Sequence, residues 1–113
     1  MFRMIWVTVP SQDAEKLGRK LLEERSIACV SFIPHVKSLF WWKGEIDRAD
    51  EVLMTLKAPA KGLRRLKKRI AELHPYEVPE IVVLRVEDAW KPYARWVKRE
   101  ATGVKAKRLR ADP

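Results

Sequence analysis

The segment ELHPYEVPEIVVL, residues 72–84, holds the side chains best suited to chemistry in this sequence. It brings the imidazole of His74, the phenol of Tyr76 and the carboxylates of Glu77 and Glu80 close together along the chain. Imidazole nitrogens and carboxylate oxygens bind divalent metal ions, so one interpretation of the segment is a metal site. The other is structural, because the macrodipole stabilises a protonated histidine at a helix C-terminus without any ligand. The pattern favours the structural role.

Two prolines make the same segment stiff. Pro75 and Pro79 fix their own φ angles and bias the residues before them towards extended conformations. Pro75 must also end any helix that reaches His74. The sequence therefore predicts a rigid corner between a helix and a strand.

The remaining candidate residues for chemistry are few. Cys29 is the only cysteine and lies in an apolar run, which predicts a buried, inert thiol and excludes an internal disulfide. His35 follows Pro34 and is predicted to be an exposed loop histidine. The chain contains no Asn, which an acylphosphatase-like site requires, and no GxSxG, HExxH or Walker motif. We therefore expect no enzymatic activity.

These residues must be positioned by alternating strands and helices, which apolar periodicity and Pro, Gly and capping residues delimit. Ser11 and Asp88 are expected N-caps, and Pro59 is expected in the first turn of a helix. The expected strands cover 4–9, 27–33, 36–42, 51–57 and 80–86, and the expected helices cover about 11–25, 59–74 and 88–103. The apolar stripe of the second helix is expected to consist of Leu63, Leu66, Ile70 and Leu73. That of the third helix is expected to consist of Trp90, Tyr93, Trp96 and Val97.

A bend at Pro34 is expected to divide one long strand, so the order is β-α-β-β-α-β plus a C-terminal helix. This order predicts an α+β, ferredoxin-like fold, with an antiparallel sheet that carries two helices on one face. The long second and third strands form a hairpin that turns at Lys43 and Gly44.

The length and composition of the chain limit its organisation. With 113 residues, we expect one domain over 1–102 and a flexible basic tail over 103–113. No signal peptide or membrane span is evident, which predicts a cytoplasmic protein without a membrane partner. The absence of Asn and the 35% of charged residues favour adaptation to heat.

Positive charge is concentrated in two stretches of the chain. The net charge is +9, and much of it lies in KGLRRLKKRI (61–70) and KAKRLR (105–110). Such a pattern allows polyanion binding, with the basic tail joining a basic helix face. It is more typical of a solvated surface, so nucleic acid is not expected as a partner. In the polyanion-binding alternative, the helix would contribute the side chains of Arg64, Arg65, Lys67 and Lys68.

Three consecutive aromatic residues, Phe40, Trp41 and Trp42, stand near the tip of the expected hairpin. Neighbouring residues of a strand point to opposite faces, so the core of one domain cannot bury all three rings. We predict that they contact another subunit.

Five stretches in order resemble the CutA family of divalent-cation tolerance proteins: VTVPS, LLEERSIACV (21–30), SLFWWKGEID (38–47), EVLMTLK and LHPYEVPEIVVL. The resemblance covers about Ile5 to Trp96. It implies a tight homotrimer, similar in architecture to the PII signalling proteins, in which the hairpin extends the sheet of a neighbour. A trimer would bury the surplus aromatic rings.

The resemblance also implies a role in tolerance of copper and other divalent metals. Copper binding in some bacterial members is attributed to a Cys and a His pair, and the matching positions here are Val7, Leu73 and His74. Of these three side chains, only that of His74 can bind Cu(II) or another divalent metal, and such a metal would need further ligands from elsewhere. By analogy, Lys57, Tyr76 and Glu80 are predicted to line an intersubunit cleft for a metal or a small anion. The alternatives are a polyanion-binding module and a purely structural or partner-binding trimer.

Overall fold

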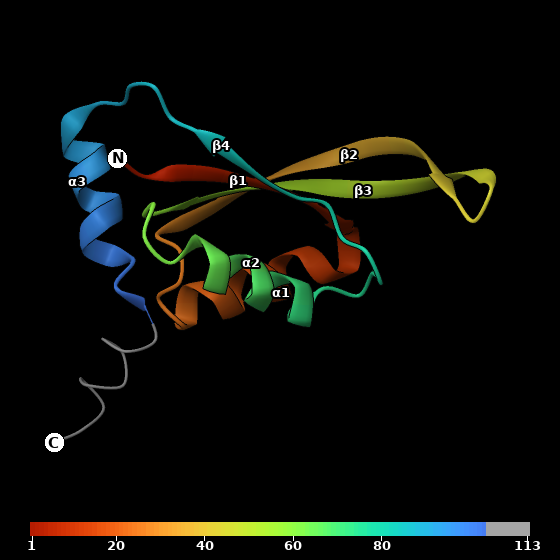
Figure 1. Cartoon of the computed structure of the whole chain (residues 1–113), viewed down its shortest axis with the longest axis horizontal. Coiled ribbons are helices and arrows are strands. Elements are labelled where there is room, and N and C mark those ends of the chain that lie inside the picture. The colour runs from red at the N-terminus through yellow and green to blue at the C-terminus, as the bar shows by residue number, and fades with distance from the viewer. Residues whose placement is uncertain (104–113) are drawn as a thin grey trace, which may run out of the picture.

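The computed structural model describes residues 1–103 of the chain and shows the predicted order of elements (Figure 1). The elements are β1 (Arg3–Pro10), α1 (Ser11–Glu23), β2 (Cys29–Trp42), β3 (Glu45–Ala58), α2 (Leu63–Leu73), β4 (Ile81–Arg85) and α3 (Lys91–Glu100). The predicted α+β, ferredoxin-like fold with an extra C-terminal helix is confirmed. None of the described helices is long and apolar enough to cross a membrane.

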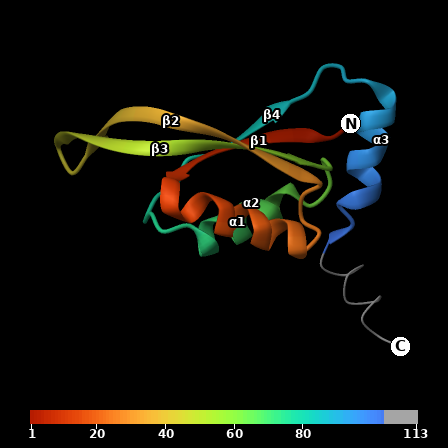
Figure 2. The same ribbon diagram turned by 180° about the vertical axis from the view of Figure 1, so that it is seen from behind.

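The four strands form one antiparallel sheet in the order β2-β3-β1-β4. β1 lies at its centre, where Trp6 pairs with Thr55 of β3 on one side and with Val82 of β4 on the other. Helices α1 and α2 lie side by side on one face of the sheet, and the opposite face carries no helix over its centre (Figures 1 and 2). Helix α3 stands at the end of the sheet away from the hairpin (Figure 2).

The core fills the space between the sheet and the two helices. Alternate residues of β1 and β3 face the helices, and Ile5, Met54 and Leu56 are fully buried. The predicted apolar stripe of α2 is confirmed, because Leu66 and Ile70 are buried and the other two members pack against the same cluster. This packing holds α2 in place, and its C-terminal end leads directly to His74.

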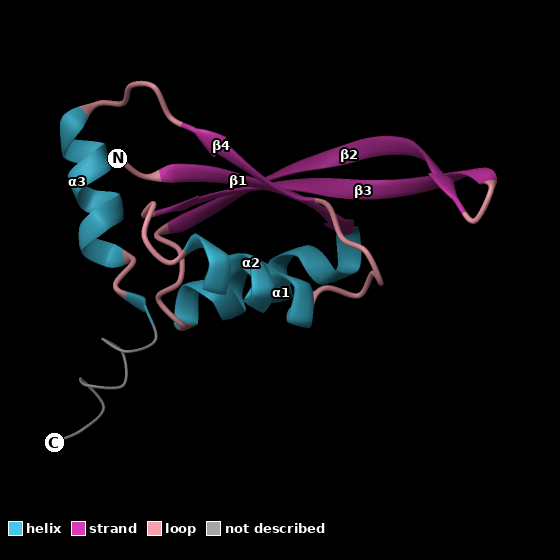
Figure 3. Cartoon of the chain, viewed as in Figure 1, coloured by secondary structure: helices cyan, strands magenta, loops and turns pink. Residues whose placement is uncertain are grey.

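The hairpin of β2 and β3 is longer than predicted and projects beyond the helices (Figure 3). β3 begins at Glu45, and its polar first residues pair with the aromatic end of β2, as Glu45 does with Trp42 and Asp47 does with Phe40. Cross-strand partners therefore override the weak strand propensity of EIDRAD (45–50). The expected bend at Pro34 is a bulge, since the register shifts between Ile33 and Val36.

Two predicted helix starts were wrong. Pro10, not Ser11, occupies the N-cap position of α1, and no side chain caps that helix. The segment after Pro59 stays irregular, and α2 begins only after Gly62, whose φ of 87° is left-handed. Glycine adopts this conformation without steric cost, so the chain can turn sharply there into the helix.

The start of α3 also differs from the prediction. Asp88 accepts a hydrogen bond from the Ala89 amide at 2.9 Å, but the helix begins later, with Trp90 as its N-cap residue. Trp90 was expected on the apolar face of α3 and is instead 77% exposed. Val97 is buried as expected, in a second cluster with Phe2.

Cys29 is only partly buried, contrary to the expected buried thiol. Its sulfur lies 3.1 Å from the Tyr93 hydroxyl of α3. Helix α3 ends at Glu100, three residues before the predicted terminator Gly103. The Gly103 amide donates a hydrogen bond to the Arg25 carbonyl at 2.7 Å, which holds the segment after α3 in place. Apart from Gly103, the predicted tail over 103–113 lies outside the described residues.

Candidate functional site

The corner between α2 and β4 is built around the ring of His74. Pro75 forces His74 into an extended conformation, with φ −79° and ψ 140°, which ends α2. His74 is only 7% exposed, and its ring Nε2 lies 2.8 Å from the carbonyl oxygen of Thr8 in β1. Its Nδ1 accepts a hydrogen bond from the Tyr76 amide at 3.0 Å. His74 thus ties the corner to the central strand.

These two hydrogen bonds define one protonation state of the ring. A backbone amide can only donate, so Nδ1 of His74 must be unprotonated, and a carbonyl can only accept, so Nε2 must carry the proton. The imidazole is therefore neutral in this geometry. The expected protonated histidine that caps its own helix was wrong, because the ring bonds across to Thr8.

A metal does not fit His74 within the described part of one chain. Both ring nitrogens are engaged, and the described residues contain no group of three or more His, Cys, Asp and Glu side chains able to hold an ion. The other two positions that the resemblance implies cannot help, since Val7 and Leu73 carry no ligand atom and pack in the core. His74 as a metal ligand stays a prediction, and metal binding there would break one of its hydrogen bonds.

Tyr76 and Glu51 form the second polar contact of the corner. The Tyr76 hydroxyl donates to the Glu51 carboxylate at 2.8 Å, and Glu51 is only 5% exposed. Burial, followed by the hydrogen bond to Glu51, raises the pKa of Tyr76 to about 12. The hydroxyl therefore stays protonated at neutral pH and satisfies a carboxylate that would otherwise be costly to bury.

Glu80 completes the contacts by accepting a hydrogen bond from the Thr8 hydroxyl at 3.2 Å. Thr8, near the end of β1, therefore binds both ends of the corner. Its backbone carbonyl contacts the ring of His74, and its hydroxyl contacts the carboxylate of Glu80. Sequence reasoning missed Glu51 and Thr8. The only available signal for Glu51 was a carboxylate in a strand, and the spacing of the chain does not indicate its contact with Tyr76.

Lys57 does not join this group within one subunit. It stands near the far end of β3, opposite Met4 and Cys29, whereas Glu51 pairs with Pro10. Along a strand, this separation is about 20 Å. Its ammonium group donates to the Ser31 hydroxyl at 3.3 Å and to the Thr55 hydroxyl at 3.2 Å. The predicted cleft of Lys57, Tyr76 and Glu80 thus stays a prediction that needs more than one subunit.

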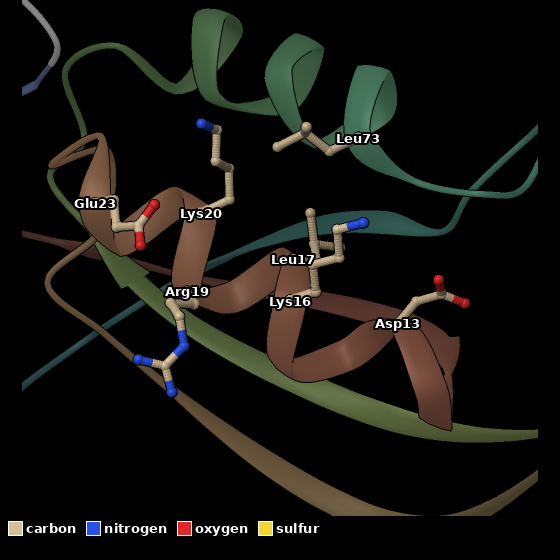
Figure 4. Close-up of a pocket in the computed structure, with 7 residues that line it drawn as sticks. All are labelled: Asp13, Lys16, Leu17, Arg19, Lys20, Glu23 and Leu73. Carbon is tan, nitrogen blue, oxygen red and sulfur yellow. The ribbon is translucent and has the colours of Figure 1, made fainter.

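A groove with a volume of about 440 Å³ runs along α1 towards Leu73 of α2 (Figure 4). Its lining is mainly charged and combines acidic with basic side chains. The lining residues are Asp13, Lys16, Leu17, Arg19, Lys20, Glu23 and Leu73. None of the polar groups of the corner lines it, so this groove is separate from the predicted cleft.

The hairpin tip exposes large apolar side chains on both of its faces. Leu39 and Trp41 on one face are 74% and 72% exposed, and Phe40 and Trp42 on the other are each 37% exposed. The tip lies far from α1 and α2 (Figure 1), so these helices do not cover it. A role of Phe40, Trp41 and Trp42 in a trimer interface stays a prediction.

The family profile described as CutA1 divalent ion tolerance protein matches residues 3–100. The chain belongs to the CutA family. The Divalent-cation tolerance protein CutA of Thermus thermophilus is 38% identical over 104 residues, which are 91% of this chain and 100% of that protein. The family confirms the resemblance seen in the sequence.

Solved CutA structures have the same fold as this chain. The PII-like protein CutA from Nostoc sp., in its apo form, is 40% identical, has a TM-score of 0.82, and aligns over 88% of this chain and 96% of its own. The structure described as the periplasmic divalent cation tolerance protein CutA from Archaeoglobus fulgidus is 31% identical, with a TM-score of 0.85, and aligns over 89% of this chain and 99% of its own. The ferredoxin-like fold is thus shared with both structures.

Proposed function

We propose that this CutA chain is a non-enzymatic homotrimer that acts in tolerance of divalent metal ions such as Cu(II) in the cytoplasm. In this proposal one heat-stable domain, residues 1–102, makes all the contacts between subunits. The observation that carries the proposal is the apolar surface of the hairpin tip, where Leu39, Trp41 and Ile46 are each more than 60% exposed. Soluble proteins rarely leave such a patch uncovered, and patches of this kind mark contact surfaces.

The two edges of the sheet support assembly through strand pairing. β2 and β4 are the edge strands, and each has a partner on one side only. An unpaired edge is a template for a strand from another chain. A hairpin that projects from one subunit can therefore extend the sheet of a neighbour and cover its apolar side chains.

The contacts of the corner support a role without catalysis. His74, Tyr76 and Glu80 each bond to a neighbouring group in the same subunit. A catalytic base or nucleophile needs an approach for substrate and a suitably tuned pKa, whereas the raised pKa of Tyr76 keeps its hydroxyl protonated. Rigid positioning of the corner is the role that these contacts favour.

For the metal, we propose a site between subunits. One described subunit does not gather enough ligands by itself, and Tyr76 and Glu80 lie apart from Lys57. A trimer can bring Lys57 of one subunit near the corner of another, which would also suit a small anion. A purely structural or partner-binding trimer would bind neither ligand.

Calorimetric titration of metal-stripped protein with Cu²⁺ tests the metal role. The variants are His74→Gln and, as a matched control, His35→Ala, which removes the only other histidine. Saturable binding of about one ion per subunit that His74→Gln abolishes and His35→Ala leaves intact would support the prediction for His74. Binding that both variants retain moves the metal to other ligands, and no binding in any of them rejects the metal role.

Sedimentation equilibrium tests the homotrimer independently. The double variant Trp41→Asp/Ile46→Lys places charges on a cross-strand pair of the hairpin, and Trp90→Asp changes an equally exposed tryptophan far from it. We expect three subunits for the wild type and for Trp90→Asp, and a lower mass for the double variant, because buried charge opposes association. A wild-type mass other than three subunits contradicts the proposal.

The proposed location needs its own measurement. Fractionation of the source cells should recover the chain with cytoplasmic marker proteins. Recovery with periplasmic markers would show that this chain shares the location named for the Archaeoglobus fulgidus protein.

A further inference from the structure

The exposed side of α2 carries a surface of positive charge that the proposed function leaves unexplained. Four exposed residues form this surface, which we call the basic face of α2: Arg64, Arg65, Lys67 and Lys68. None of the four has an ion-pair partner among the described residues. Arg69, by contrast, bonds to Glu24 at 2.7 Å and to Glu72 at 3.4 Å. The acidic side chains nearby thus serve Arg69 and leave the basic face uncompensated.

The arrangement of these cations works against the stability of the isolated helix. Arg64 stands three and four positions before Lys67 and Lys68, so like charges are neighbours on the helix surface and repel each other. Arg64 and Arg65 also lie in the first turn, which contains no acidic residue, and there the macrodipole disfavours positive charge. Placing cations where they destabilise their own helix indicates a role outside folding, since a bound anion would relieve both effects.

The location of α2 keeps this surface accessible. Helices α1 and α2 cover the face of the sheet opposite to the uncovered one, and the hairpin projects away from them (Figure 3). A trimer assembled through the hairpin and the edge strands therefore leaves the basic face of α2 in contact with solvent. The apolar stripe of α2 is not available to a membrane, because Leu66 and Ile70 are buried in the core of the subunit.

The sequence alone did not favour nucleic acid as a partner, but four exposed cations without an ion-pair partner in the described part of the chain change that expectation. We propose that the basic face of α2 binds the phosphate backbone of double-stranded nucleic acid without sequence preference. The guanidinium groups of Arg64 and Arg65 can each contact phosphate oxygens through paired N–H groups, and Lys67 and Lys68 add point charges. Residues 63–73 contain no aromatic side chain on which an unpaired base could stack. The surface therefore fits a duplex better than a single strand.

Fluorescence anisotropy with a labelled DNA duplex and the full-length protein tests this proposal. The variant Arg64→Ala/Arg65→Ala/Lys68→Ala removes three charges from the basic face. The matched control Lys91→Ala/Arg95→Ala/Lys98→Ala removes three exposed charges from α3, none of which has an ion-pair partner in the described part of the chain. Both variants have the same net charge, so a difference between them reports the location of the charges and not their sum. Circular dichroism melting of both variants confirms that they are folded.

The wild-type affinity should fall steeply as salt is raised, because each phosphate contact releases bound counterions. Three phosphate contacts on the basic face should lower the affinity for the duplex by roughly 40-fold as the salt concentration rises from about 50 to about 200 mM. The α2 variant should lose this part of the salt dependence and bind at least about 10-fold more weakly at low salt, while the α3 variant stays close to the wild type.

Three results would overturn the proposal. One is a folded α2 variant that binds the duplex no more weakly than the α3 variant does. Another is wild-type affinity for a single strand of the same sequence that equals or exceeds its affinity for the duplex. The third is wild-type binding that does not change with salt. Each of these outcomes leaves the homotrimer and the metal role untouched, because their measurements use different residues and different readouts.

Discussion

Two parts of the same hairpin use similar residues in opposite surroundings. Where β3 runs beneath the helices, Leu56 is completely buried, and where β2 projects beyond them, Leu39 is 74% exposed. Both are leucines in strands of one antiparallel ladder. The difference shows that the residue pattern determines the strand, whereas the neighbouring elements determine whether its side chains are covered. The projecting part has the composition of a core without the helices that would complete one.

The substitution with the largest expected effect is Leu56→Ala in the covered part. It should lower the free energy of unfolding by about 2–5 kcal/mol, because it leaves a cavity among fully buried neighbours. Urea denaturation followed by circular dichroism measures this. A loss below about 1 kcal/mol would mean that the covered part is less tightly packed than the structure indicates.

Tyr76→Phe tests the boundary between the two parts, where β3 emerges near Glu51. Removing the hydroxyl leaves the buried carboxylate of Glu51 without its partner at 2.8 Å and should cost about 1.5–3 kcal/mol. The same denaturation experiment applies, with Tyr93→Phe as a comparison that also removes one tyrosine hydroxyl, whose partner is the Cys29 sulfur and not a buried carboxylate. An effect within about 0.5 kcal/mol would show that water replaces the bond to Glu51.

Raising the pH probes the same boundary without a substitution. Burial raises the pKa of Tyr76 and of Tyr93 to about 12, above about 10 for an unfolded tyrosine. The stabilisation is therefore complete below pH 10 and is lost as the pH rises from about 10 to about 12. Thermal melting across this range should show a fall in the wild type that is smaller in Tyr76→Phe. An equal fall in both proteins would assign the effect to other groups.

The smallest expected effect on the subunit is that of Leu39→Ala in the projecting part. An exposed side chain contributes within about 0.5 kcal/mol to the stability of an isolated chain. In an assembly, the midpoint of unfolding rises with protein concentration, and Leu39→Ala should reduce this rise, whereas Leu56→Ala lowers the midpoint at every concentration. Denaturation over a range of about 100-fold in protein concentration measures both effects. A Leu39→Ala midpoint that depends on concentration as the wild type does would remove Leu39 from the contact surface.

The fold was predictable because its strands and helices have clear apolar periods. Ile5, Met54 and Leu66 all occupy the core positions that alternation and helical spacing predict. The start of β3 was not predictable from propensity, because the polar residues after Glu45 gain their strand conformation from partners in β2. Trp90 was misplaced because an aromatic residue at helical spacing also fits the position just before a helix begins.

The candidate site was predictable only in part, for a different physical reason. Prolines on either side of Tyr76 predicted a rigid corner from local rules alone, and His74 ends α2 as expected. The partners of these residues, Thr8 and Glu51, lie far away in the sequence, and no local rule connects them. The neutral state of His74 likewise depends on which atoms face its ring, and only the folded structure provides these.

The central position of β1 has a consequence for synthesis of the chain. β1 is made before both of its neighbours in the sheet, which are β3 and β4. At about 5–20 residues per second, a ribosome needs about 2–10 s to extend the nascent chain from Pro10 to Ala58. During that interval the apolar residues of β1 have neither partner strand, and chaperones can bind them. The slow step of maturation is therefore expected to be the insertion of the first strand between two later ones.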